Sequence, residues 1–264
     1  MKRIATFVDP KILIVSDDYN GRAREFASFL KAFVSDTPNM IVVLGGDGTM
    51  LHAIQAHWQK RLPFVGINLG HRGFLLTEVE KSALIDTFRK PFWIYSSPLL
   101  FVETRNLKGE TREGLAFNDA WVRCGAPSRA AWIEVSIDGV VRIPKAMGDG
   151  MLVATAAGST SYARAMGAHP IPIDTPMLVV AGSNLMEPPG WKAAYLPLES
   201  VIRFRSVDPT PFPKKRPLLG FVDGVEHGEV IEMIARVHPD ASIELAFPEG
   251  YDIASKLTAI QFPV

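Results

Sequence analysis

The stretch IVVLGGDGTMLHAI (residues 41–54) places one carboxylate inside a glycine-rich turn, between a strand pattern and a helix pattern. Such junctions bind anions because backbone N–H groups and the helix dipole point at the ligand. The turn lacks the Lys-Ser/Thr ending of a P-loop and the glycine spacing of the dinucleotide fingerprint. Asp47 stands at its centre, where its charge would repel a bound phosphate.

Two interpretations account for Asp47. It caps the following helix, or it binds a metal or takes a proton from a hydroxyl that is about to attack. In phosphoryl transfer, a carboxylate of this kind orients and deprotonates the acceptor alcohol. The electrostatics favour this second hypothesis, in which the amides of the turn hold the donor phosphate and Asp47 serves the acceptor.

The stretch FNDAWV (residues 117–122) places Asn118 and Asp119 in an otherwise apolar strand pattern. Neighbouring strand residues point to opposite faces, so one of the two should face inward unless the strand ends or bulges there. An amide beside a carboxylate suits the recognition of sugar hydroxyls, which need a donor and an acceptor. A surface Asx turn is the alternative.

Two further stretches carry ligand-binding residue types. In GDGMLVATAAGSTSYARAMGA (residues 148–168), Thr160, Ser161 and Tyr162 open a short helix, where free N–H groups and hydroxyls can hold a polar ligand or simply cap the helix. In GINLGHRGFLLTEV (residues 66–79), Arg72 can meet a phosphate. Phe74 can stack on a base or belong to the core. The six histidines show no metal-ligand spacing.

Composition limits the class of protein. Lys and Arg total 28, as do Asp and Glu, so the net charge is zero, which argues against bulk electrostatic binding of nucleic acid or anionic membranes. A single cysteine, Cys124, excludes an internal disulfide and a multi-cysteine metal site. No signal peptide is apparent, and no segment approaches the ~20 apolar residues of a membrane span. We expect a cytoplasmic protein without nucleic-acid or membrane partners.

The first third of the chain alternates strand and helix patterns. Strands are expected at residues 11–15, 40–44 and 63–68, and helices at 21–33 and 49–58. Continuous apolar strands separated by helices indicate a parallel sheet covered on both faces. Ligands bind beyond the carboxyl ends of such strands, where GGDGT and NLGHRGF both lie.

From about Trp93 onward, short and often alternating strand patterns predict an antiparallel β domain. One of these patterns is GLAFNDAWVRC (residues 114–124), and a helix-like insert at Ser159–Gly167 interrupts the series. The predicted organisation is therefore an α/β domain over residues 1–95 and a larger all-β domain over 96–249. The tail at about 250–264 is compatible with a return to the first domain.

In this order, GGDGTML, GINLGHRGFL, FNDAWV, GDGMLVATAAGSTSYA, FVDG and FPEGYDIASKL resemble the NAD kinase family. GGDGT alone is shared with diacylglycerol, sphingosine and phosphofructokinase relatives, and the block Gly158–Tyr162 narrows the choice. The resemblance implies an α/β domain, an all-β domain and NAD bound between them. The implied reaction transfers the γ-phosphate of ATP to the 2′-hydroxyl of the adenosine ribose, giving NADP, with Mg²⁺ bridging the donor phosphates.

The resemblance also assigns residues. Asp47 is the expected general base and Phe74 the adenine-side wall. Asn118 and Asp119 match the family's pair at the dinucleotide, and Asp149 matches the aspartate near the nicotinamide. The other expected NAD-binding residues are Gly48, Thr160, Ser161, Tyr162 and Ala165, and the expected phosphate-donor residues are Gly45, Gly46, Thr49, His52 and Arg72. A dimer or tetramer is implied as well.

Several positions depart from the family pattern. Ala156 and Ala157 replace a proline and a hydroxyl residue, Met147 stands where a basic residue or glycine is usual, and Val225 replaces a glutamine. The family's Pro-His-Ser/Thr-Leu segment appears as AGSNL (residues 181–185), without its histidine. Two other functions stay open: a lipid or other alcohol kinase, because it would share the GGDGT turn, and a non-catalytic regulator that binds NAD or NADP, because of the missing histidine and of Ala156 and Ala157.

Overall fold

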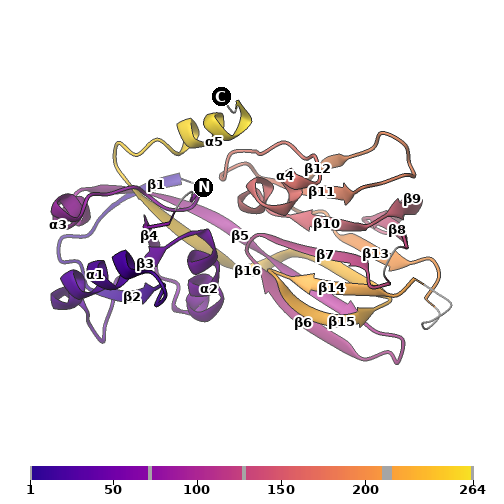
Figure 1. Ribbon diagram of the computed structural model, residues 1–264, viewed down its shortest axis with the longest axis horizontal. Helices are drawn as coiled ribbons and strands as arrows, with labels where there is room; N and C mark the ends of the chain where they lie inside the picture. The colour runs from indigo at the N-terminus through magenta and orange to yellow at the C-terminus, as the bar shows by residue number, and fades with distance from the viewer. Residues whose placement is uncertain (1, 71–72, 127–128, 210–215, 263–264) are drawn as a thin grey trace. The chain divides into compact units, whose positions relative to one another are not determined.

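The computed structural model describes residues 2–70, 73–126, 129–209 and 216–262. The chain divides into two compact units, unit 1 with residues 1–97 and 242–264, and unit 2 with residues 98–241 (Figure 1). Both boundaries fall inside long strands, β5 (Pro91–Arg105) and β16 (Glu232–Pro248). Each unit has its own hydrophobic core.

A parallel sheet forms the centre of unit 1. Strands β2 (Ile12–Ser16), β3 (Met40–Gly45) and β4 (Phe64–Asn68) pair in that order, and the end of β16 continues the parallel sheet beside β4. Strand β1 (Lys2–Thr6) pairs antiparallel with the start of β5. The predicted mostly parallel sheet is confirmed.

Helices cover both faces of this sheet. Helices α1 (Gly21–Leu30) and α3 (Leu84–Arg89) share a core with alternate residues of β3 and β4. The intervening residues face the other side, where a Cβ on Gly66 would lie 2.7 Å from Met50 Cε of α2 (Asp47–His57). The first core includes Phe26, Leu30, Val42, Leu44, Val65, Ile67, Leu84 and Phe88.

The last helix of the chain, α5 (Ile253–Gln261), belongs to unit 1. The Asp252 carboxylate caps it by accepting the N–H groups of Ala254 and Ser255, and Leu257 is its buried residue. Short 3₁₀ turns η1 (Lys31–Phe33), η2 (Trp58–Lys60) and η3 (Lys81–Ala83) complete the described helical segments of this unit.

Unit 2 consists mainly of two antiparallel sheets. One sheet has the strand order β12-β11-β10-β7-β14-β15, and the other contains β16-β13-β8-β9 together with β5 and β6. The predicted antiparallel β region is confirmed. The bounds of these strands are β6 Thr111–Ala116, β7 Asp119–Cys124, β8 Ala131–Ile137, β9 Val140–Gly148, β10 Gly150–Ala154, β11 Met177–Ser183, β12 Ala193–Pro197, β13 Ile202–Ser206, β14 Leu218–Val222 and β15 Val225–Val230.

The two sheets of unit 2 enclose one core. Phe204 of β13, at 1% exposure, is its largest side chain and packs in a cluster with Met151 of β10 and Leu178 of β11. Two tight hairpins hold neighbouring strands, since Asp138-Gly139 and Asp223-Gly224 adopt the positive φ angles that a two-residue primed turn requires.

Two predicted boundaries are wrong. Helix α2 begins at Asp47, two residues before the predicted start at Thr49, because Gly46 in extended conformation is its N-cap. The helix-like insert is a 3₁₀ turn, η4 (Ala157–Thr160), followed by the short helix α4 (Tyr162–Ala165).

A third boundary concerns the strand pattern over residues 114–124, for which the sequence leaves open an end or bulge at Asn118 and Asp119 as the alternative. The structure ends β6 at Ala116 and starts β7 at Asp119, because the Asp223 carboxylate takes the N–H groups of Phe117, Asn118 and Asp119. These amides therefore have a side-chain partner, and the strand pattern is interrupted at the polar pair.

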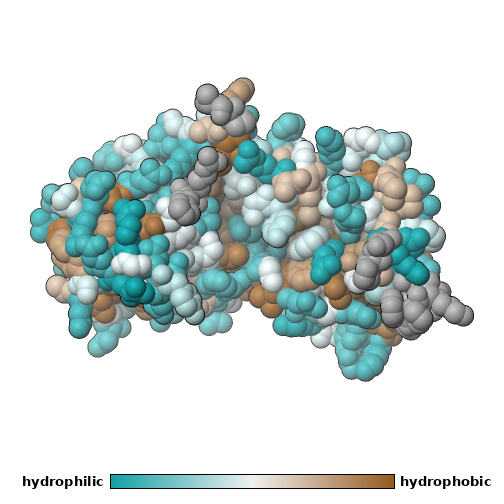
Figure 2. Space-filling model, in the orientation of Figure 1, coloured by the Kyte–Doolittle hydropathy of each residue, from teal (hydrophilic) through white to brown (hydrophobic). Residues whose placement is uncertain are grey.

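The outer surface of unit 1 is mostly polar. Figure 2 shows hydrophilic residues over most of its visible face, with small apolar patches between them, and the apolar side chains of β3 and β4 lie inside. Across the described residues, no helix is long and apolar enough to cross a membrane.

We expect Phe204→Ala to lower the free energy of unfolding by about 3–5 kcal/mol, because it empties a large buried volume between the sheets of unit 2. Urea titration measures the change. Val207→Ala, at a 43% exposed position, is the matched control and should change the free energy by less than about 0.5 kcal/mol. Equal effects of the two substitutions would contradict this description of the core.

Candidate active site

The glycine turn connects β3 to α2 in unit 1. A Cβ on Gly45 would lie 2.4 Å from Thr49 Oγ1, so this position needs glycine for the helix to start where it does. The Gly46 N–H points to the Thr49 hydroxyl at 3.4 Å. Gly46 and Gly48 have open space where a Cβ would stand. Their backbone is therefore accessible to a ligand at the N-terminus of α2, as an anion site requires.

Asp47 is the first residue of α2, and its carboxylate does not cap the helix. Instead, Oδ2 accepts the Phe74 N–H at 2.8 Å and Oδ1 accepts the Leu75 N–H at 2.9 Å. Both oxygens are thus fixed by the segment that follows β4. A carboxylate offers about four lone-pair sites, so each oxygen can still accept a further hydrogen bond.

The other residues predicted to line the site near this turn differ in their exposure to solvent. His52 is exposed on α2, and Thr49 is half-buried. Phe74 has a buried side chain, at 6% exposure, while its amide binds Asp47. Arg72 lies outside the described residues. The assigned roles of these residues stay predictions.

In unit 2, Asn118 and Asp119 lie where β6 has ended and β7 begins. The Asp223 carboxylate accepts three backbone N–H groups here, from Phe117 at 2.6 Å, Asn118 at 2.9 Å and Asp119 at 3.0 Å. The Asp223 N–H in turn donates to the Asp119 carbonyl at 2.9 Å. The Asn118 Oδ1 atom is buried and has no hydrogen-bond partner in the described structure. A buried amide oxygen without a partner is costly, and a hydroxyl that donates to it would remove that cost.

The turn after β10 packs directly against this pair. Thr155 donates its N–H to the Asn118 carbonyl at 2.9 Å and its hydroxyl to the Phe117 carbonyl at 2.6 Å. A Cβ on Gly158 would lie 2.1 Å from the Asn118 carbonyl oxygen, so only glycine allows this approach. The motifs at residues 117–119 and 155–158 are thereby joined into one site.

Two carboxylates share this buried region. Burial, together with the negative charge of Asp223, raises the pKa of Asp119 to about 7. Burial also raises the pKa of Asp223 to about 6, while its three N–H donors act in the opposite direction. Charge at Asp119 is therefore unfavourable unless a hydrogen-bond donor, such as a sugar hydroxyl, arrives there.

The predicted residues of the short helix are near the surface. Tyr162 is 58% exposed, and its ring stacks on Trp121 of β7 at 5.9 Å between ring centroids. Ser161 and Ala165 are exposed, and the Thr160 hydroxyl donates to the Ala157 carbonyl at 3.1 Å. The substituted positions Ala156 and Ala157 are both buried.

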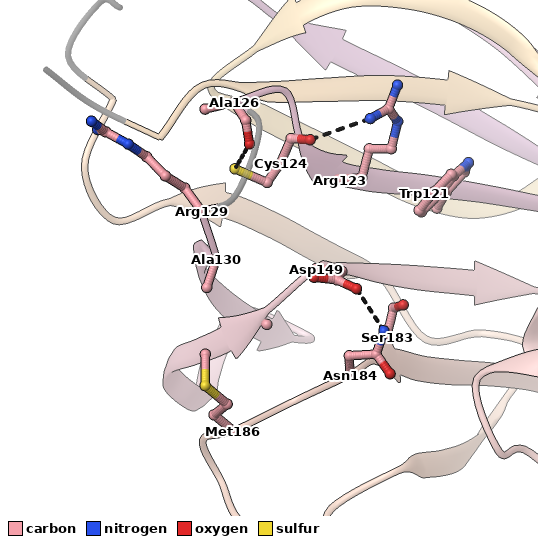
Figure 3. A pocket seen from close by; sticks show the side chains of 11 residues that line it. Trp121, Arg123, Cys124, Ala126, Arg129, Ala130, Asp149, Ser183, Asn184 and Met186 are labelled. Atoms are coloured by element: carbon pink, nitrogen blue, oxygen red, sulfur yellow. Dashed lines mark hydrogen bonds between the residues drawn. The ribbon is translucent and has the colours of Figure 1, made fainter. Parts of the chain in front are cut away.

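Asp149 lies at the other end of β7 from Asp119. The register of β7 and β10 pairs Ala154 with Asp119 and Gly150 with Arg123, which separates the two carboxylates by about five strand steps, on the order of 17 Å. Asp149 borders a pocket of about 750 Å³, and Asn184 Nδ2 donates to its Oδ2 at 2.6 Å (Figure 3). Asn184 belongs to the segment that lacks the family histidine.

Figure 3 shows side chains from several strands around this pocket. Trp121 and Arg123 of β7 border it on one side, and Ser183, Asn184 and Met186 on another. The pocket thus combines one aromatic face with charged and amide groups, a mixture typical of sites for polar small molecules.

The sequence analysis missed Asp223 and Asn184. Asp223 precedes a glycine between two strand patterns, and Asp-Gly in that setting predicts a hairpin turn. This signal would place Asp223 in a turn, but not beside Asn118. Asn184 lies in the AGSNL segment that departs from the family pattern, but its contact with Asp149 could not be predicted, because it depends on the pairing of β10 and β11.

Comparison with known proteins is consistent with these features. Residues 13–91 match the family model for the ATP-NAD kinase N-terminal domain. The NAD kinase of Cereibacter sphaeroides is 30% identical over 222 residues, covering 84% of this chain and 85% of that protein. The chain belongs to the NAD kinase family. The NAD kinase of Rickettsia canadensis is 27% identical over 95% of this chain and 96% of its own.

Solved structures share the fold. The structure of yeast NADH kinase complexed with NADH has a TM-score of 0.78 and 16% identity, covering 95% of this chain and 86% of that one. An NAD kinase from Archaeoglobus fulgidus in complex with ATP has a TM-score of 0.72 and 20% identity, covering 94% and 97%. The expected membership of the NAD kinase family and its fold class are confirmed.

The raised pKa of Asp119 predicts a pH dependence of stability. Because the folded protein holds this proton more tightly than the unfolded chain, the stabilising contribution is present at low pH and is lost as pH rises through about 7. We expect the thermal midpoint of unfolding to fall between about pH 5 and pH 8, and to fall less in Asp119→Asn. Asp174→Asn, at an exposed position of unit 2, is the control. Parallel pH profiles for the parent and Asp119→Asn would contradict the assignment.

Proposed function

We propose that this protein is an NAD kinase, which transfers the γ-phosphate of ATP to the 2′-hydroxyl of the adenosine ribose of NAD and forms NADP. Family membership supports the reaction class. The observation that carries the proposal is the carboxylate of Asp47, held through both oxygens by the amides of Phe74 and Leu75 beside a glycine turn. A fixed carboxylate at such a turn suits an alcohol acceptor attacking a bound phosphate.

In the proposed step, the acceptor hydroxyl donates its hydrogen bond to a free lone pair of Asp47. As the ribose oxygen attacks the γ-phosphorus, its proton passes to the Asp47 carboxylate. The new P–O bond forms while the bond to the leaving ADP oxygen breaks. The N–H groups of Gly46 and Gly48 at the start of α2 are the proposed holders of donor phosphate oxygens.

Mg²⁺, when bound with the donor, neutralises charge on the phosphates. Among the described residues, no group of three or more His, Cys, Asp or Glu side chains could hold a metal ion by itself. This fits a cation that takes most of its ligands from substrate phosphates and water, as Mg²⁺ commonly does. We assign no protein ligand to it.

For NAD, we propose that unit 2 supplies the main recognition. The unpartnered Asn118 Oδ1 and the buried Asp119 carboxylate offer acceptors to ribose hydroxyls. Tyr162, with its exposed ring backed by Trp121, offers a stacking surface. Asp149, which lies between β9 and β10 opposite the far end of β7, offers an acceptor for the nicotinamide half. A dimer or tetramer and a cytoplasmic location complete the proposal.

A lipid kinase would need an apolar acceptor cavity, whereas the pocket at Asp149 carries Arg123, Asn184 and Asp149 itself. These charged and amide side chains in the lining favour the dinucleotide. The non-catalytic alternative rests on the missing histidine. However, Asn184 lies in that segment and donates a hydrogen bond to Asp149, so a polar side chain is still present there.

A donor and acceptor panel tests the proposal. With ATP and Mg²⁺, we expect NAD to be converted to NADP, identified by mass, and diacylglycerol and sphingosine to remain unmodified. A parallel series with NADH as acceptor and with other nucleotides or polyphosphate as donors measures the acceptor and donor preferences. Bound NAD without any NADP would support the regulator instead, and a phosphorylated lipid would support the lipid kinase.

A further inference from the structure

Lys256 of α5 contacts the segment that holds Asp47. Its ammonium group donates to the Gly73 carbonyl at 2.8 Å and to the Leu76 carbonyl at 2.9 Å. The side chain is 23% exposed, and its distance to Glu78 Oε1 is 3.6 Å. The ammonium group of Lys256 therefore interacts mainly with two backbone carbonyl oxygens of unit 1. Charge-assisted bonds of this kind are stronger than neutral ones.

Tyr251, just before α5, reinforces the same contact. Its hydroxyl donates to the Leu76 carbonyl at 2.9 Å, and the Lys256 ammonium lies 5.2 Å from the centre of its ring. The ring stacks on Phe247 at an interplanar angle of 3°. Burial raises the pKa of Tyr251, with the nearby charges of Glu78 and Asp47 adding to the effect, so its hydroxyl remains a donor at neutral pH.

The backbone of residues 73–76 thus makes two sets of hydrogen bonds, one through its N–H groups and one through its carbonyls. Its two central N–H groups, from Phe74 and Leu75, bind the carboxylate of Asp47. Its two outer carbonyls, from Gly73 and Leu76, bind Lys256. Because residues 74–76 form a bend and the carbonyls on either side of the two amides are bound from the C-terminal segment, this backbone cannot shift without moving the amides that hold Asp47.

We propose that Lys256 is a positioning residue for Asp47, and that α5 thereby sets the geometry of the reacting carboxylate through residues 73–76. The expected effect on turnover rests on the proposed function, that is, on NAD kinase activity. It does not require Lys256 to touch a substrate. Small displacements of a reacting group reduce rate more than they reduce binding, so the effect falls on kcat.

The test compares Lys256→Met with the parent protein. Methionine keeps much of the apolar stem but cannot bind the two carbonyls. We expect kcat for NADP formation to fall about tenfold, with KM for NAD changed by less than about twofold. Lys256→Arg should restore most of kcat, because a guanidinium can donate to both carbonyls.

Lys81→Met is the matched control. Lys81 is a lysine of unit 1 that pairs with Glu25 at 2.6 Å, and within the described part of the chain it makes no hydrogen bond or ion pair with residues 73–76. It should leave kcat and KM unchanged within about twofold. If Lys256→Met does not fold, Tyr251→Phe removes a single hydroxyl bond to the same segment and should lower kcat by about twofold to fivefold.

Amide hydrogen exchange, measured by NMR, separates this inference from the proposed function. In Lys256→Met, the Phe74 and Leu75 amides should exchange about tenfold faster, while the amides of β3 keep the parent rate. The exchange measurement remains valid even if the parent protein makes no NADP. That result would contradict only the proposed function. Unchanged exchange at Phe74 and Leu75 overturns the positioning role, and so does unchanged kcat in an active protein.

Discussion

The structure depends on aspartate carboxylates that bind backbone N–H groups where the chain leaves its strands. Asp47 takes two such groups, from Phe74 and Leu75, and Asp223 takes three, from residues 117–119. A buried N–H without a partner is costly, so these irregular segments persist because a carboxylate satisfies them. The glycine turn of unit 1 and the Asn118-Asp119 pair of unit 2, both predicted to bind ligand, lie directly beside such a carboxylate.

This arrangement explains why the glycines are where they are. Gly45 makes room for Thr49, and Gly158 makes room for the Asn118 carbonyl, at distances that no Cβ could tolerate. Gly46 and Gly48 have open space instead, which suits the close approach of a ligand to the backbone. The glycine-rich motifs therefore combine two functions: some glycines pack the site together and others keep it accessible.

The sequence predicted the architecture well, because apolar periodicity and chain order are local properties. The parallel strands of unit 1 and the position of α1 follow from such patterns. The polar pair Asn118-Asp119 left a break in the strand open as an alternative, but its cause could not be predicted, since the responsible carboxylate, Asp223, is more than a hundred residues away. The same holds for Asp47, whose turn was recognised but whose partners Phe74 and Leu75 come from a distant loop. Lys256 lies in the quoted stretch FPEGYDIASKL, but its role could not be predicted, because its partners are backbone carbonyls.

The central claim is that the carboxylate of Asp47 accepts the proton of the attacking ribose hydroxyl. The most direct measurement is the single-turnover rate of NADP formation by Asp47→Asn, together with the Kd for NAD of the same variant. Asparagine keeps the size of the side chain but cannot take the proton at neutral pH, so the rate should fall by about 100-fold or more. The Kd should change by less than about threefold. A variant that retains the parent rate would contradict the account.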